Sequence, residues 1–194
     1  MSERRNGSYH HGDLRNALRK SARAILDEEG LESLSLRAVA RRAGVSHAAP
    51  YRHYPNHEGL LAELAADGFA ELRDAIATAG AAPGTQADKI AEIGAAYMRF
   101  AVRHPALARL MFGSQLSNRG DFPDLGTAAD GVGTEIGKAL GDDVLGLAVW
   151  GAVHGLAMLI LEDVIDLGQR HSGLTVLPSR AEILLRSLFT LRSV

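Results

Sequence analysis

Apolar residues recur every three or four positions along most of the chain, the spacing that places them on one face of an α-helix. Leu14, Leu18 and Ala22 begin this pattern, with Arg15 and Arg19 on the opposite face. No stretch stands out with the two-residue alternation typical of a β-strand. The pattern predicts an all-α fold, with helices near residues 13–29, 36–43, 47–54, 56–79, 86–103, 105–113, 122–139, 142–167 and 178–192.

Residues with capping chemistry support several of these boundaries. Four expected helices follow a side chain whose oxygen can accept a hydrogen bond from a free amide at a helix start: Asp13, Ser35, Ser46 and Asn56. Gly30 and Gly44 are expected to end the first two helices, because glycine adopts the left-handed conformation of a helix end at little cost. Pro55 is expected to end the third, because it lacks the amide that would continue it.

The segment Gly80–Gly84 (GAAPG) is the best candidate for a domain boundary, because glycine and proline interrupt helices. It suggests four parts: a flexible arm (1–12), a three-helix head (13–60), a linking helix (61–79) and a C-terminal helical body (80–194). Residues 113–121 and 168–178 are expected to be loops.

Composition narrows the classes of function. The 194 residues include no cysteine, which excludes disulfides, thiol catalysis and cysteine-ligated metal sites. The first 12 residues hold no apolar segment typical of a signal peptide, so we expect a cytoplasmic protein. The net charge is −2, but residues 1–60 carry 10 Lys and Arg against 7 Asp and Glu. Residues 61–194 carry 11 against 16, so a polyanion is expected to bind the head.

Residues 144–161 form an 18-residue run without Asp, Glu, Lys or Arg, close to the length of a transmembrane helix. The run includes His154 and three glycines, and acidic residues flank it on both sides without a basic anchor. We therefore expect this helix to be buried in a large core or in an oligomer, and not in a membrane.

The second and third expected helices are short and are joined by Gly44-Val45-Ser46, as in a helix-turn-helix. In that motif the second helix lies in the major groove of DNA, while the first crosses the backbone. Ser35 and Arg37 would then lie where a hydroxyl and a guanidinium can hold phosphate. A three-helix bundle with a solvated basic face is the alternative, because A-x-x-A-G-V-S occurs in unrelated proteins.

Residues 36–61 (LRAVARRAGVSHAAPYRHYPNHEGLL) closely resemble the helix-turn-helix of the TetR family of bacterial transcriptional regulators. The likeness includes the A-G-V-S turn, the Y-R-H-Y run that begins at Tyr51, and the acidic Glu58. The segments Y-H-H-G-D-L-R from Tyr9 and W-G-A-V-H-G from Trp150 resemble a branch of the family whose C-terminal domain carries a Trp…His-Gly element.

The resemblance implies a homodimer whose two heads read a pseudo-palindromic operator, and whose body binds a small molecule that changes the spacing of the heads. It places the family's DNA-facing positions on Ser35, Arg37, His47, Ala48, Ala49, Tyr51, Arg52 and His53. Two further residues are candidate DNA contacts. Ser46 opens the expected recognition helix, and His57 stands where the family usually has a phosphate-binding lysine. Pro50 departs from a regular helix, because its ring removes a donor, and is expected to widen the first turn.

Two histidine pairs, His10 with His11 and His53 with His57, have the residue type of a metal site. Pro55 separates the second pair, and neither pair has a third ligand at an obvious spacing, so we expect no metal and no cofactor. Hydrolase, phosphate-loop and dinucleotide motifs do not occur, which argues against an enzyme.

The body is expected to bind a ligand and to dimerise. Candidate lining residues are Tyr97, Phe100, Leu110, Met111, Phe112, Trp150, His154 and Met158, although a core histidine satisfied by a carbonyl is an equal alternative for His154. Helices 142–167 and 178–192, with their two-fold copies, are expected to form the dimer interface. The first would span about 39 Å, comparable to the roughly 34–36 Å between half-sites on DNA.

These inferences favour a homodimeric repressor that a small-molecule ligand releases from double-stranded DNA. A helical protein-interaction module that has lost operator binding is the alternative, since Pro50 and His57 depart from the family pattern. An enzyme that acts on a small molecule is the third reading.

Overall fold

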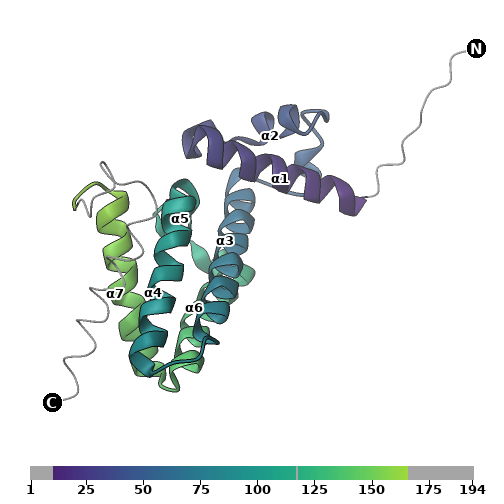
Figure 1. The fold of residues 1–194 in the computed structure, drawn as a ribbon. Helices are drawn as coiled ribbons and strands as arrows, with labels where there is room; N and C mark the ends of the chain where they lie inside the picture. Colours follow the sequence, from purple (N-terminus) through teal and green to yellow (C-terminus); the bar gives the residue numbers. More distant parts are fainter. Residues whose placement is uncertain (1–10, 117, 166–194) are drawn as a thin grey trace, which may run out of the picture.

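The computed structural model describes residues 11–116 and 118–165, and every regular element within these ranges is a helix. Figure 1 shows two parts: a head built on α1 and α2, which lies across one end of the molecule, and an elongated body of roughly aligned helices. The helix α3 begins in the head and continues into the body, where it packs against α4, α5 and α6.

The head comprises α1 (His11–Glu29), a 3-10 turn (Leu31–Ser33), α2 (Leu36–Arg42) and a second 3-10 turn (Pro50–Arg52). Its core contains fully buried side chains from each α-helix and from the start of α3: Leu18, Ile25, Leu26, Val39, Leu60 and Leu64. The apolar face predicted for the first helix is thus the face that packs inward.

The helix α3 (His57–Gly80) is 24 residues long and starts with the predicted Asn56 cap, whose side chain accepts a hydrogen bond from the Gly59 amide at 2.9 Å. Leu60 and Leu64 are buried near its start, and Leu72 and Ile76 are buried near its end. At 1.5 Å per residue the helix is about 36 Å long. One continuous helix therefore contributes to the cores of both parts.

The body adds α4 (Gln86–Arg103), α5 (Pro105–Phe112), a 3-10 turn (Arg119–Asp121), α6 (Pro123–Leu140) and α7 (Asp143–Leu161). Thr85 and Asp88 form a capping box at the start of α4, in which each side chain binds the other residue's backbone amide. The helix α6 packs between α3 and α7, and α4 contacts both α3 and α7.

The corner between α6 and α7 brings two backbones into contact. Gly141 turns the chain in the left-handed conformation (φ 68°), and Asp142 caps α7. A Cβ built on Gly146 would lie 2.7 Å from both the Cα and the amide nitrogen of Gly137. No side chain could move aside to relieve that contact, so glycine is required where the helices cross.

Most predicted boundaries hold to within one or two residues. The helix predicted at 86–103 has these bounds in the structure, and Gly30 ends α1 in the left-handed region (φ 83°). Asp13 was expected to cap the first helix, which is wrong, because Asp13 lies within α1 (His11–Glu29). The predicted arm up to residue 10, the loop at 168–178 and the helix at 178–192 lie outside the described residues.

The prediction of a helix over residues 142–167 is also wrong, because α7 ends at Leu161. Asp163 adopts the left-handed conformation (φ 55°), and the amides of Asp163 and Val164 bond back to the carbonyls of Ile160 and Leu159. Arg109 of α5 fixes this end by donating to the Leu161 carbonyl. The 19 residues of α7 span only about 28 Å, so this helix does not match the half-site separation.

Gly146→Ala is expected to lower the free energy of unfolding by about 1–3 kcal/mol, because the added methyl group meets backbone that cannot move without separating α6 from α7. Gly126→Ala is the matched control on α6, since a Cβ there would meet nothing within 4 Å. That variant is expected to gain about 0.5–1 kcal/mol from helix propensity. Urea unfolding of both variants measures the difference, and equal stabilities would contradict the close crossing.

Candidate DNA interface and ligand cavity

The first half of the helix-turn-helix has the predicted geometry. The Ser35 hydroxyl accepts a hydrogen bond from the Ala38 amide at 3.1 Å, which caps α2. Gly44 follows α2 with φ 69°, and the amides of Gly44 and Val45 bond to the carbonyls of Arg41 and Ala40. This paired arrangement ends the helix and turns the chain sharply toward His47.

The second half differs from the prediction. The expected helix over residues 47–54 is wrong, because the chain instead makes turns followed by the 3-10 segment Pro50–Arg52. Pro50 has no amide to donate to the Ser46 carbonyl, which accepts from the Ala49 amide at 3.0 Å instead. The predicted Ser46 cap does not form, since the 3-10 segment has no side-chain cap. Pro50 thus replaces the helix with tighter turns.

Three of the candidate DNA contacts, Ser35, Arg37 and His47, line one groove at the start of α2. A groove of about 680 Å³ there is lined by Glu29, Ser33, Ser35, Arg37, Ala38, Arg41 and His47. Of the candidate set, the exposed members are Ser35, Arg37, Ser46, His47, Ala48, Tyr51, Arg52 and His57. Ala49 is half-buried. Arg41, which the sequence analysis missed, follows Arg37 by one helical turn, and that spacing was a readable signal.

The charges on this surface are only partly neutralised. Arg42 forms ion pairs with Glu28 at 2.6 Å and Glu29 at 3.6 Å, so it is directed back toward α1. Arg37, Arg41 and Arg52 form no ion pair with any residue that the structure describes. Three exposed guanidinium groups therefore remain available for an anionic partner such as a phosphate backbone.

His53 lies apart from this surface. It is half-buried in a cavity of about 560 Å³ between α1, α3 and the start of α6, and its Nε2 atom is buried without a hydrogen bond. His57 is exposed at the start of α3. Within residues 11–116 and 118–165, no group of three or more His, Asp or Glu side chains is placed to hold a metal.

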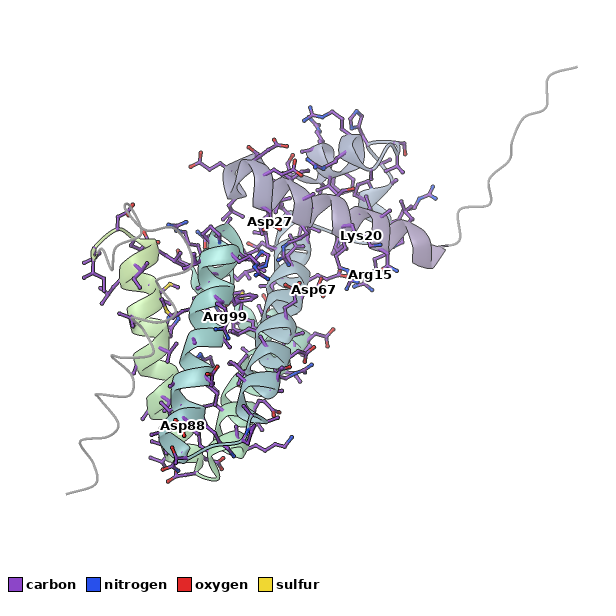
Figure 2. The ribbon with its side chains drawn as sticks, in the orientation of Figure 1. Arg15, Lys20, Asp27, Asp67, Asp88 and Arg99 are labelled. Atoms are coloured by element: carbon purple, nitrogen blue, oxygen red, sulfur yellow. The ribbon has the colours of Figure 1, made fainter. Side chains whose placement is uncertain are left out.

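Three ion pairs join α1 to α3 near this cavity. Each joins an arginine of α1 to an acid of α3, at regular steps of four residues: Arg15–Glu63 (2.9 Å), Arg19–Asp67 (3.1 Å) and Arg23–Glu71 (2.8 Å). Figure 2 shows Arg15 and Asp67 close to the place where the two helices meet. The Tyr54 hydroxyl is buried beside Arg15 and Glu63, and burial followed by the charge of Glu63 raises the pKa of Tyr54 to about 12.

Arg23 also connects the head to the body. Its guanidinium lies 3.1 Å from Nδ1 of His104, the residue between α4 and α5, and pairs with Asp27 at 2.8 Å. Burial, and then the positive charge of Arg23, lowers the pKa of His104. The neutral imidazole can accept the hydrogen bond from Arg23, so this contact depends on His104 staying uncharged.

A second cavity opens on the surface of the body, between α3, α5, α6 and α7, and two residues of its wall, Leu147 and Gly151, are exposed. Its volume is about 290 Å³, and it is lined by Phe69, Phe112, Arg119, Ala129, Leu147, Trp150, Gly151 and His154. The walls are largely aromatic, with Phe69 edge-on to Phe112 at a centroid distance of 5.1 Å. The size is near the lower limit of small-molecule sites, which run from about 300 to 1,000 Å³.

The polar groups of this cavity come mainly from α7. His154 Nδ1 lies 3.0 Å from the Tyr97 hydroxyl of α4. Burial lowers the pKa of His154 and raises that of Tyr97, so both side chains are neutral near pH 7. The Trp150 indole N–H is buried and lies close to the Tyr97 hydroxyl, but forms no hydrogen bond of normal geometry within the described chain.

Only some of the predicted lining residues reach this cavity. Phe112, Trp150 and His154 line it, and Tyr97 stands behind His154. Leu110 and Met111 are fully buried, Met158 is half-buried, and Phe100 lines a different groove beside Arg99. Five further residues line the cavity and were not predicted: Phe69, Arg119, Ala129, Leu147 and Gly151. Helical periodicity identified apolar faces but not which faces meet around a gap.

The helix α7 has the length and composition of a membrane span, with a mean hydropathy of 2.1, and 28% of its most apolar window is buried in the described structure. It packs against α4 and α6 through Val149, Val153 and Ala157. Asp142, Asp143 and Glu162 stand at its two ends, without the basic or aromatic anchors that membrane helices favour. The opposite face remains exposed.

Comparison with known proteins gives matches for both parts of the chain. The N-terminal profile of bacterial regulatory proteins of the tetR family matches residues 18–64. A profile described as tetracyclin repressor-like, C-terminal domain, matches residues 90–172. The first covers the helix-turn-helix, and the second covers most of α4, all of α5 to α7, and every residue that lines the cavity beside α7 except Phe69.

Individual relatives agree with these profiles. An HTH-type transcriptional regulator of Mycobacterium tuberculosis is 32% identical over 124 residues, which are 63% of this chain and 51% of that protein. The chain thus spans about half the length of the curated relatives it matches.

Solved structures share the fold. A protein of unknown function from Rhodococcus sp. RHA1 has a TM-score of 0.71 at 29% identity, over 94% of this chain and 98% of its own. A transcriptional regulator FadR from Bacillus subtilis, solved in complex with stearoyl-CoA, has a TM-score of 0.67 at 16% identity, over 89% of this chain and 98% of its own. On the two profiles, which account for most of the head and the body, the chain belongs to the TetR family of bacterial regulatory proteins, a family of transcriptional regulators and not of enzymes.

Proposed function

We propose that the protein is a cytoplasmic, homodimeric transcriptional repressor that binds a pseudo-palindromic operator through its helix-turn-helix and is released by a small molecule in the body cavity. The observation that carries the DNA-binding part is the exposed surface at the start of α2. There Ser35, which caps α2, lines the same groove as Arg37 and Arg41. The guanidinium groups of these two arginines form no ion pair with any acid that the structure describes. Such groups hold phosphate and position a head on DNA.

The contacts divide by chemistry. Ser35, Arg37 and Tyr51 have phosphate-binding groups and are expected to act on every DNA sequence. His47 and Ala48 lie in the turn before Pro50, where the backbone can approach base edges, and are expected to set base preference. Because a 3-10 turn replaces the recognition helix, we expect base contacts to come from this short turn.

The second copy in the proposed dimer packs on the exposed face of α7. Three large apolar side chains on this helix are exposed: Val144 at 80%, Leu147 at 65% and Leu159 at 43%. Gly151 and Gly155 lie between them and are also exposed, and their lack of side chains allows a helix to approach closely. An apolar face of this length is costly to leave in water, so a partner helix is expected to cover it.

Coupling between the cavity and the head is proposed to run through α3. Phe69 lines the cavity, and it lies on the same helix as Asp67 and Glu71, which hold α1 by ion pairs. A ligand that displaces Phe69 would shift the helix that carries these acids. If ligand and operator prefer different positions of the heads, each weakens the binding of the other by the same coupling free energy.

A helical interaction module without operator binding is the second candidate function. The observation that favours it is the loss of the recognition helix at Pro50, together with His57 at the lysine position. Salt dependence separates the two functions, because specific DNA binding persists in the presence of competitor DNA and weakens steeply with salt.

Footprinting of the DNA that flanks the gene tests the central proposal. We expect two protected half-sites with two-fold symmetry, and protection that competitor DNA does not remove. The absence of a protected site over a range of salt concentrations would favour the interaction module instead.

Arg37→Gln is expected to weaken binding to operator and to unrelated DNA by a similar factor, and to reduce the slope of log K against log salt by about 1, because one phosphate contact is lost. Fluorescence anisotropy at several salt concentrations measures both quantities. Lys138→Gln, near the far end of α6, is the control with the same change in charge and should leave both unchanged. A loss restricted to the operator would contradict the assignment of Arg37 to phosphate.

Val144→Glu combined with Leu159→Glu is expected to produce monomers, because two carboxylates would be buried in the α7 interface without partners. Operator affinity should fall by about tenfold or more, since one head cannot occupy both half-sites. Sedimentation velocity and anisotropy measure the two effects. Thr127→Glu, exposed on α6, should remain dimeric. A dimeric double variant would show that copies associate through another surface.

A further inference from the structure

The surface that faces the cavity beside α7 is almost entirely apolar. Aromatic rings form much of it: Phe69 lies edge-on to Phe112, and the Phe112 ring lies 4.2 Å from the His154 ring, centroid to centroid. A wall of this kind offers no group that can replace the water around a charge. The remaining apolar wall comes from small or aliphatic residues: Ala129, Leu147 and Gly151.

The polar atoms next to the cavity contact each other. The Tyr97 hydroxyl lies 3.0 Å from His154 Nδ1, and the buried indole N–H of Trp150 lies close to the same hydroxyl. Burial lowers the pKa of His154, so its imidazole is neutral near pH 7. The hydroxyl and the indole N–H therefore lie behind the wall, and the imidazole brings no charge to it.

Arg119 is the one residue with a permanent charge among the described residues that line the cavity. Its guanidinium donates from Nη2 to the Met111 carbonyl near the end of α5, which holds the 3-10 turn against that helix. Because the surface that faces the space is almost entirely apolar, Arg119 contributes mainly its methylene groups to it.

The size and the opening of the cavity limit what can enter. An apolar protein cavity of about 150 Å³ is large enough to bind benzene. The volume here is about 290 Å³, which has room for one or two rings. The cavity opens beside Leu147 and Gly151, and a Cβ built on Gly151 would meet nothing within 4 Å. The space at this glycine is therefore an unobstructed entrance.

We propose that the cavity takes an uncharged, largely hydrocarbon molecule of one or two rings, with a ring against Phe69 and Phe112 and its outer side beside Gly151. This assignment rests on the proposed effector role of the cavity and names the chemical class of its ligand. Removal of the apolar surface from water drives binding, whereas a charged analogue would lose its hydration without gaining a partner.

Trp150 is the single tryptophan of the chain and lines the cavity, so its fluorescence reports on binding without a label. The probes are two pairs of similar size, isobutylbenzene with phenylacetate and propylbenzene with phenethylamine, measured on the full-length protein. Each hydrocarbon is expected to change the Trp150 emission saturably, and its charged partner is expected to bind about tenfold or more weakly.

The phenylacetate measurement also tests whether the charge of Arg119 reaches the space, because an accessible guanidinium would favour the acid. If phenylacetate or phenethylamine binds as tightly as its hydrocarbon, or if neither hydrocarbon gives a saturable change, the proposal is wrong.

Two glycines of α7 locate the binding. Gly151→Leu places a side chain in the entrance and is expected to weaken hydrocarbon binding by about tenfold or more. Gly155→Leu is the matched control, because Gly155 is exposed one helical turn further along α7 and does not line the cavity. A Cβ on either glycine would meet nothing within 4 Å, so both variants are expected to fold.

Both glycines also lie on the face proposed for the second copy, so any effect of a leucine on dimerisation is shared by the two variants. Equal hydrocarbon affinities in Gly151→Leu and Gly155→Leu would overturn the placement of the ligand in this cavity.

This test is independent of DNA. Hydrocarbon binding by a protein that protects no DNA site would support the ligand class and refute the repressor. A specific footprint from a protein that binds neither hydrocarbon would support the repressor and refute the ligand class.

Discussion

The burial of α3 at both of its ends is the constraint on which the molecule depends. Leu60 and Leu64 belong to the core of the head, and Leu72 and Ile76 belong to the core of the body. The acids between them pair with the arginines of α1, so the head is fixed to the helix by both apolar contacts and charges. Neither part can shift along α3 without exposing apolar surface, and this ties the position of the head to the packing of the body.

Local chemistry allowed much of this fold to be predicted from the sequence. The predicted caps Ser35 and Asn56 accept hydrogen bonds from backbone amides at the starts of α2 and α3. Such caps act within one turn of a helix and can be recognised without knowledge of tertiary contacts. Two predictions were wrong because the backbone conformation at a single residue overrode the helical spacing of the apolar residues around it. Pro50 prevented the third helix, and left-handed Asp163 ended α7 although apolar residues continue to Leu167.

The candidate sites were predictable to different degrees. The surface around Ser35 and Arg37 is built from one short segment of chain, so the resemblance of that segment to a known motif suggested it. The cavity gathers side chains from four separate elements: α3 (Phe69), the 3-10 turn (Arg119), α6 (Ala129) and α7 (His154). Whether these side chains surround one space depends on how the helices pack against each other, and the sequence of a single segment does not determine this packing. The lining residues predicted from the sequence were Phe112 of α5 and Trp150 and His154 of α7.

The close fit of Trp150 against Gly133 of α6 has a consequence for the size of the cavity. A Cβ at Gly133 would lie 3.1 and 3.2 Å from two carbons of the indole ring, so the ring rests directly on the helix backbone. Gly133 does not touch the cavity, yet a single methyl group there would push the ring toward it and reduce its volume. A substitution at Gly133 would therefore make this cavity smaller, while every residue that lines it stays the same.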